Sequence, residues 1–261
     1  MSTSSTSEKR VAAFFDLDRT LIAGASAFVF ARAARDAGHI RLQDFAADAY
    51  RAIKFRFVGA SDETSVGVRD RILAAVGGMK QSDLVALNDT VLPELLGLIR
   101  PEARALLEQH HEAGRETWIV SASPIEIVEP LAVALGMTGG IGTKGEVDNG
   151  VYTGKLDGPF CYGEGKAEAI KLLAAERNID LSQSWSYSDS MSDLPMMEIV
   201  GHAVAVNPDS QLAGIARRKG WPVVVFAQRS KMLIRRSTSI TAVAIGMLLM
   251  YSLGLRQGNK R

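Results

Sequence analysis

The chain has 261 residues, of which 47% are hydrophobic and 23% are charged, and its formal net charge is +1. This length fits one α/β domain with an inserted smaller subdomain, and the apolar share is enough for a buried core. The single cysteine, Cys161, excludes an intramolecular disulfide framework and is expected to be a small buried hydrophobe.

The N-terminal region leads into the most informative stretch of the chain. Residues 1–9 are polar and rich in Ser and Thr, which predicts a disordered leader, because the apolar run behind them is too short for a signal peptide. Residues 11–15 are apolar and run into the sequence Asp-Leu-Asp-Arg-Thr at 16–20. This pattern predicts a buried parallel strand that delivers Asp16 and Asp18 to its carboxyl end, where open α/β sheets bind ligands.

Two neighbouring carboxylates have a defined chemical use. They can bind a hard cation, and one of them can attack phosphorus if the cation neutralises the approaching phosphate. For the dipeptide pattern alone, the competing interpretation is a strand followed by a solvated acidic turn.

Residues 26–98 show no second strand that ends in charge. Their apolar residues have helical spacing, with breaks at Gly59 and at Gly77-Gly78. We therefore predict an inserted helical subdomain over this range.

From Pro101 onward, strand-like and helix-like segments alternate. Alternation of this kind predicts a parallel sheet with helices on both faces, which is a three-layer α/β fold. The predicted elements are a helix from Pro101 to Gly114, strand 117–120, helix 124–135, a hairpin at 147–152 with an Asn-Gly turn, helix 166–177, strand 185–188, strand 203–206, helix 210–219 and strand 222–226.

Polar residues follow these segments in a specific order. Strand 117–120 ends at Ser121, Lys166 lies at a predicted helix start, and strand 185–188 runs into Asp189 and Asp193. With the Asp-x-Asp-x-Thr pattern at 16–20, the sequence resembles the haloacid dehalogenase superfamily of phosphatases, whose four motifs occur in this order. The likeness is greatest to the phosphoserine-phosphatase-like branch, subfamily IB, and covers about residues 10–226.

The resemblance implies a fold and a division into domains. The fold is a Rossmann-like, three-layer parallel sheet, with a catalytic core formed by residues 10–25 and 99–228. Residues 26–98 would be a helical cap that closes over the phosphate, selects the substrate and excludes water.

The resemblance also implies a role for each motif residue. Asp16 is the nucleophile that becomes an aspartyl-phosphate, and Asp18 is the general acid and then the general base. Ser121 donates a hydrogen bond to a phosphate oxygen, and Lys166 offsets the charge on Asp16. From the residues alone, Ser121 could serve only as a helix cap and Lys166 could be solvated, whereas Ser123, directly before a proline, is the better predicted N-cap.

Magnesium is the implied cofactor. Its expected ligands are Asp16, Asp189 and the backbone carbonyl of Asp18, which are the oxygen donors that Mg²⁺ prefers. Asp193 would orient a metal-bound water or Lys166, and as an acid at a helix N-terminus it could also complement the helix macrodipole.

The sequence departs from the phosphoserine phosphatases at two positions. Ser192 stands where relatives commonly have Asn, and Ala25 matches the position of a cap Glu that holds the substrate amine. Arg69 or Arg71 could match an anion-binding arginine. These departures argue against assigning phosphoserine as the substrate. The histidines, predicted to be surface or cap residues, are His39, His110, His111 and His202.

The C-terminal region has its own charge pattern. Residues 210–261 contain ten Lys or Arg and no Asp or Glu, so residues 1–209, with 20 basic and 29 acidic residues, have a net charge of −9. Within the basic tail 229–261, residues 237–255 are uncharged, and as a helix with a rise of about 1.5 Å per residue they would reach roughly 28 Å, close to the thickness of a bilayer. We expect a membrane-associated tail with a cytoplasmic catalytic domain, the alternative being a C-terminal core helix.

The leading functional hypothesis is a Mg²⁺-dependent phosphomonoester hydrolase that acts on a small phosphorylated metabolite or a lipid-linked phosphate. Two alternatives keep the same acidic site: a phosphotransferase with an aspartyl-phosphate intermediate, and a phospho-acceptor or binding module without turnover. Nucleic acid is not an expected partner, because the aromatic residues near the basic tail do not form a stacking array.

Overall fold

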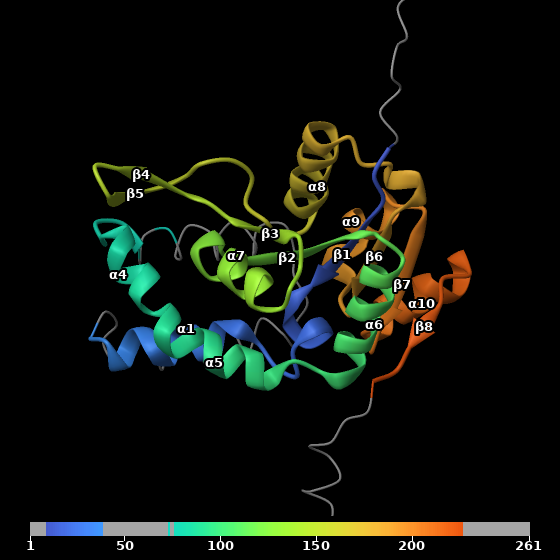
Figure 1. The fold of residues 1–261 in the computed structure, drawn as a ribbon, viewed down its shortest axis with the longest axis horizontal. Helices are drawn as coiled ribbons and strands as arrows, with labels where there is room; N and C mark the ends of the chain where they lie inside the picture. The colour runs from blue at the N-terminus through green and yellow to red at the C-terminus, as the bar shows by residue number, and fades with distance from the viewer. Residues whose placement is uncertain (1–8, 39–72, 74–75, 227–261) are drawn as a thin grey trace, which may run out of the picture. The chain divides into compact units, whose positions relative to one another are not determined.

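The computed structural model describes residues 9–38, 73 and 76–226 (Figure 1). The chain divides into two units, 1–224 and 225–261, and the fold below is that of the first. The predictions for the leader up to residue 8 and for the tail 229–261 lie outside the described residues, as do His39, Arg69 and Arg71. Within the described ranges, no helix is long and apolar enough to cross a membrane.

The described residues build a six-stranded parallel sheet, and a parallel sheet was predicted. Its strands pair in parallel in the order β3-β2-β1-β6-β7-β8, so the acidic motif follows a strand in the middle of the sheet. The strands are β1 Ala12–Asp16, β2 Glu116–Pro124, β3 Gly139–Thr143, β6 Trp185–Ser188, β7 His202–Val206 and β8 Val223–Val224.

Strand β3 was not predicted, because its glycines lower the strand signal. These glycines are needed for packing. A Cβ atom at Gly139 would lie 2.6 Å from the Trp118 ring, and one at Gly140 would lie 2.8 Å from the Val128 side chain. Close approach of backbone to side chains therefore explains why this strand is poor in β-formers.

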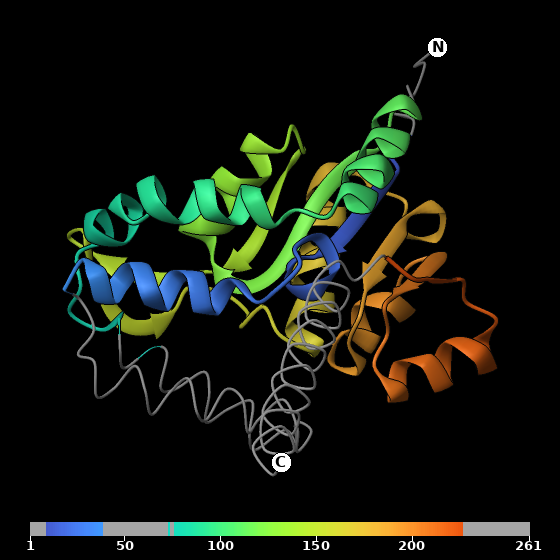
Figure 2. The same cartoon turned by 90° about the horizontal axis from the view of Figure 1, so that it is seen from below.

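Helices cover both faces of the sheet, which confirms the three-layer α/β fold (Figures 1 and 2). On β1, Ala12 and Phe14 belong to the core formed with α8, α9 and α10, whereas Phe15 contacts His110 of α6. Because strand side chains alternate, Asp16 continues the face that α8 covers. The helices of the layers are α6 Pro101–Glu112, α7 Ile125–Ala134, α8 Glu164–Arg177, α9 Leu194–Glu198 and α10 Ser210–Lys219.

The described part of the insertion after β1 is mostly helical, with turns at 37–38 and 77–78. It contains α1 Ser26–Asp36, α4 Gln81–Ala86 and α5 Asn88–Leu98. Its two ends meet, because Ala23 N–H donates to the Leu98 carbonyl at 2.8 Å and Arg100 N–H donates to the Leu21 carbonyl at 2.9 Å. The insertion therefore leaves and rejoins the core through adjacent antiparallel segments.

The predicted hairpin is present, and it also contacts the inserted segment, which was not predicted. Strands β4 Gly145–Asp148 and β5 Val151–Leu156 flank a turn in which Asn149 and Gly150 have φ of 49° and 80°, the left-handed values that an Asn-Gly turn requires. Gly78 N–H donates to the Tyr152 carbonyl at 2.8 Å. The hairpin thus joins the inserted segment.

His110 corrects a prediction, because it is not a surface or cap residue. Only 3% of it is exposed, and its Nε2 lies 2.8 Å from the Tyr187 hydroxyl. Burial, assisted by the charge of Arg115, lowers the pKa of His110 to about 4, so the ring is neutral near pH 7. His110 is a core residue whose ring packs against Phe15 of β1 and Tyr187 of β6.

Candidate active site

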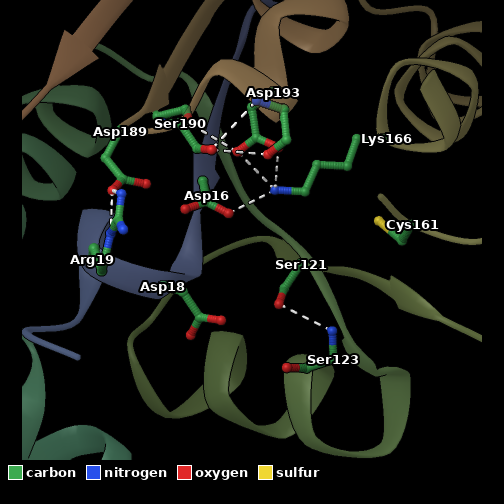
Figure 3. Close-up of polar contacts among 12 residues, drawn as sticks. Asp16, Asp18, Arg19, Ser121, Ser123, Cys161, Lys166, Asp189, Ser190 and Asp193 are labelled. Atoms are coloured by element: carbon green, nitrogen blue, oxygen red, sulfur yellow. Dashed lines mark hydrogen bonds and ion pairs between the residues drawn. The ribbon is translucent and has the colours of Figure 1, made fainter. Parts of the chain in front are cut away.

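Lys166 joins two carboxylates that come from opposite ends of the sequence (Figure 3). Its Nζ lies 2.6 Å from Asp16 Oδ1 and 2.9 Å from Asp193 Oδ2. All three side chains are buried. The first, third and fourth motifs therefore meet, and the alternative of a solvated Lys166 is wrong.

The local sequence explains how Lys166 reaches Asp16. Helix α8 begins directly after Gly163, whose φ of 57° lies in the left-handed region. A Cβ atom at Gly165 would lie 1.8 Å from the Phe160 carbonyl oxygen. Glycine at these two positions lets the chain turn tightly, so Lys166 lies in the first turn of a helix that covers the Asp16 face of the sheet.

Charge in this cluster is not balanced. Burial raises the pKa of Asp16 well above its ordinary range; Lys166 opposes this, and three other carboxylates add to it. For Lys166, burial would lower the pKa, but Asp16 and Asp193 outweigh it and raise the pKa above its ordinary value. The lysine is therefore charged, and Asp16 has less cationic compensation than a carboxylate needs.

Asp189 forms an ion pair with Arg19, a contact that the sequence did not predict. The Arg19 guanidinium forms an ion pair with Asp189 through Nε and Nη2 (Figure 3). Arg19 lies in the irregular helical turn η1 Leu17–Leu21 and has a φ of 63°, which is uncommon for a residue with a side chain. Burial raises the pKa of Asp189 to about 6, although Arg19 opposes the shift.

The donor set fits a divalent cation. In the described part of the chain, no three His, Cys, Asp or Glu side chains form a metal cluster, and the expected ligand set needs only two carboxylates and one backbone carbonyl. Asp16, Asp18, Asp189 and Asp193 are four interacting carboxylates that share two cations, Lys166 and Arg19. The excess of two negative charges, on oxygen donors, is what Mg²⁺ would neutralise.

Asp18 lies in η1 and contacts the start of the inserted segment. Its Oδ1 accepts a hydrogen bond of 2.7 Å from the backbone N–H of Ser26, the first residue of α1. Burial raises the pKa of Asp18, and the hydrogen bonds from Ser26 counteract part of that shift. The carboxyl group is therefore both desolvated and held by a helix N-terminus.

Ser121 ends the predicted strand and is buried, as its proposed role requires. Its Oγ accepts the Ser123 N–H at 3.1 Å, so it forms a short turn instead of capping α7. The prediction that Ser123 caps this helix is wrong, because the N-cap is Pro124 and Ser123 lies within β2. The Ser123 hydroxyl instead lies 2.9 Å from the Ser26 hydroxyl.

Serines fix the last acidic motif. The Ser188 hydroxyl donates to Asp193 Oδ2 at 2.7 Å, so Asp193 binds both Lys166 and Ser188, and it also lies at a helix N-terminus, as the N-cap residue of α9. Ser192 stands in the place of the usual Asn, and its hydroxyl lies 3.0 Å from the Ser190 hydroxyl. Strand alternation could have identified Ser188, because it lies on the same face as the buried Ser186.

Two predicted positions lie near the site without joining it. Ala25 is the N-cap of α1 and offers no side-chain hydrogen bond, so it supplies no carboxylate for a substrate amine. Cys161 is fully buried, as expected, and burial raises the pKa of its thiol to about 12. It is therefore protonated and is not a nucleophile.

Comparison with known proteins agrees with this arrangement. Residues 13–198 match the haloacid dehalogenase-like hydrolase family. The chain is 37% identical over 217 residues to a phosphoserine phosphatase of Mycobacterium tuberculosis, a match that covers 82% of this chain and 70% of the relative. The chain belongs to this hydrolase family. A histidinol-phosphatase of Neisseria meningitidis is 35% identical over 159 residues, or 59% of this chain and 72% of that one.

Solved structures show the same fold as this haloacid dehalogenase-like hydrolase. A protein of unknown function from Bordetella pertussis matches with a TM-score of 0.73 and 26% identity, over 83% of this chain and 99% of that one. A phosphoserine phosphatase matches with a TM-score of 0.57 and 16% identity, over 88% and 99%. The second likeness supports the fold alone.

Proposed function

We propose that this protein is a Mg²⁺-dependent phosphomonoester hydrolase that forms an aspartyl-phosphate on Asp16. The observation that carries the proposal is the buried Lys166, which holds Asp16 and Asp193 together at the carboxyl end of β1 within a cluster of excess negative charge. A carboxylate held there by one lysine can attack a phosphorus atom whose charge is neutralised nearby.

The reaction has two steps. In the first, an Asp16 oxygen forms a bond to phosphorus, the bond from phosphorus to the ester oxygen breaks, and Asp18 gives its proton to the leaving oxygen. In the second, Asp18 takes a proton from a water that attacks the acyl-phosphate, which releases inorganic phosphate and restores Asp16. Lys166 balances charge on Asp16, and the Ser121 hydroxyl donates to a phosphate oxygen.

Magnesium would be held by Asp16, Asp189 and the Asp18 carbonyl, and it supplies charge neutralisation as two anions approach each other. Arg19 must share Asp189 with it. Retention of both Asp18 and Lys166 favours turnover over a passive phospho-acceptor, since an acceptor needs no acid for a leaving group.

The substrate class is a small phosphate monoester. Relatives are named for phosphoserine and for histidinol phosphate, which both carry an amine, but Ala25 offers that amine no carboxylate. A lipid-linked phosphate is the further option if residues 237–255 bind a membrane, and that segment lies outside the described residues.

The test is a panel of phosphate esters that includes phosphoserine, histidinol phosphate, a sugar phosphate and a lysophospholipid. We expect Mg²⁺-dependent phosphate release that EDTA stops and that Asp16→Asn lowers by at least about 10³-fold. The matched control is Asp157→Asn, which alters an exposed acid on the hairpin side. Wild-type rates in Asp16→Asn would overturn the proposal, and phosphate recovered on an added alcohol would identify a phosphotransferase.

A further inference from the structure

The N-terminus of α1 lacks a cap of its own. Its N-cap residue, Ala25, has no side chain that can accept a hydrogen bond. The N–H groups of a first helical turn need acceptors, and here the Ser26 N–H donates to Asp18 Oδ1 at 2.7 Å. A carboxyl oxygen from the core therefore takes the place of the missing cap.

The same serine reaches the phosphate side of the site. Its hydroxyl lies 2.9 Å from the Ser123 hydroxyl, and the Ser123 N–H donates to Ser121 Oγ at 3.1 Å. Only 3% of Ser26 is exposed. One residue of the inserted segment is thus bonded both to the candidate acid and to the loop that would hold the phosphate.

The chain between Asp18 and Ser26 is short and closed. Arg19 N–H donates to the Gly24 carbonyl at 2.9 Å, and Ile22 forms an antiparallel bridge with Ile99 where the insertion rejoins the core. Because these bonds close the loop, the Ser26 N–H at the start of α1 is held beside Asp18, and its hydrogen bond fixes one oxygen of the Asp18 carboxyl group.

We propose that Ser26 is a positioning residue whose backbone N–H aims Asp18 at the leaving oxygen, so that the start of the inserted helix governs protonation of the leaving group. This inference rests on the proposed function. It predicts a defect that depends on the leaving group. An alkoxide needs a proton as it departs, whereas p-nitrophenolate departs without one.

Two substitutions separate the N–H from the hydroxyl. Ser26→Ala removes the hydroxyl and keeps the N–H. Ser26→Pro removes both, and the fold can accept it, because proline is favoured at the first helical position and Ala25 already has the extended φ of −122° and ψ of 123° that precede proline.

The measurement is the single-turnover rate of the first step with an alkyl phosphate and with p-nitrophenyl phosphate. We expect Ser26→Pro to lose at least about tenfold more than Ser26→Ala on the alkyl ester, and less than about threefold more on the aryl ester, in line with the loss of an aimed general acid. Adding Ser26→Pro to Asp18→Asn should cause no further loss, because Ser26 acts only through Asp18. Equal losses on both esters would overturn the inference.

A second measurement needs no folded proline variant. In the wild-type protein the Ser26 amide proton should be shifted downfield in the NMR spectrum and protected from exchange, and Asp18→Ala should abolish both features. An amide unaffected by Asp18→Ala refutes the inference. Failure of the proposed function is distinct, since wild-type protein would then release neither p-nitrophenol nor alkyl alcohol.

Discussion

Two clusters of charged side chains in this protein differ in their ratio of cations to carboxylates. At the carboxyl end of β1, four carboxylates share Lys166 and Arg19. At the amino end of β2, Glu116 alone receives two arginines: Arg177 donates to it twice, at 2.9 and 3.0 Å, and Arg10 once, at 2.8 Å.

The pKa shifts record the difference. Burial raises the pKa of Asp16 and of Asp189 because too few cations oppose it. Burial would also raise the pKa of Glu116, but the hydrogen bonds from Arg177 and Arg10 outweigh it and lower the pKa. Around Glu116 two arginines more than compensate one carboxylate, whereas the cluster at β1, which we propose receives a cation and a phosphate, holds uncompensated negative charge at a cost in stability.

The largest effect on the acidic cluster is expected from the removal of Lys166. Lys166→Met should lower kcat by about 10³-fold and cost roughly 3–5 kcal/mol of unfolding free energy, because it leaves Asp16 and Asp193 buried without their cation. Kinetics and urea denaturation measure the two effects. Arg177→Met is the matched control, since Glu116 keeps Arg10. Equal denaturation midpoints for the two variants would contradict the prediction.

The next test uses pH. The pKa of Asp189 is about 6 in the folded protein against an ordinary value of 3.8, so its contribution to stability is fully present below about pH 4 and is lost as the pH rises through about 6. In EDTA, the wild type should lose about 3 kcal/mol more than Asp189→Asn across that range. Denaturation at a series of pH values checks this, and saturating Mg²⁺ should reduce the difference. Parallel pH profiles in EDTA would refute it.

The acidic cluster could largely be predicted from the sequence, whereas the Glu116 cluster was not predicted. Asp16, Lys166 and Asp193 were identified because their motifs follow predicted strands or begin a helix, and parallel strands bring such positions to one edge. The six-stranded parallel sheet was predicted except for β3, whose glycines hide it.

The sequence predicted that Lys166 acts on Asp16 and that Asp193 orients Lys166, but the other partners of the motif residues could not be predicted. Nothing in the order of residues indicates that the Arg19 side chain turns to Asp189, or that the Ser26 N–H reaches Asp18. Those contacts depend on a left-handed residue in the turn η1 and on the angle at which α1 leaves the core. His110 was misassigned for a similar reason, because a polar residue beside polar neighbours gives no sign that its ring packs against Phe15 and Tyr187.

A smaller effect is expected from the replacement of Arg19. Its ion pair with Asp189 competes with a metal for the same carboxylate, so Arg19→Asn should bind Mg²⁺ about tenfold more tightly, a gain of about 1.4 kcal/mol. Asn is chosen because it tolerates the φ of 63° at this position. Calorimetric titration with Mg²⁺ measures the affinity without turnover. Weaker binding would show that Arg19 helps to form the metal site instead of competing for it.

The smallest effect is expected at the Glu116 cluster. Glu116→Gln should cost about 1 kcal/mol or less, because the pair is partly solvated and each arginine can return to water. Its pH dependence has the opposite sign to that of Asp189: the pKa of Glu116 is lowered by folding, so its contribution is present above its ordinary pKa of 4.5 and is lost as the pH falls below that value. Urea denaturation at pH 7 and below pH 4.5 should therefore show a difference between wild type and variant that shrinks in acid, with kcat unchanged. A difference that grows in acid would mean that Glu116, like the carboxylates of the active site, is short of positive charge.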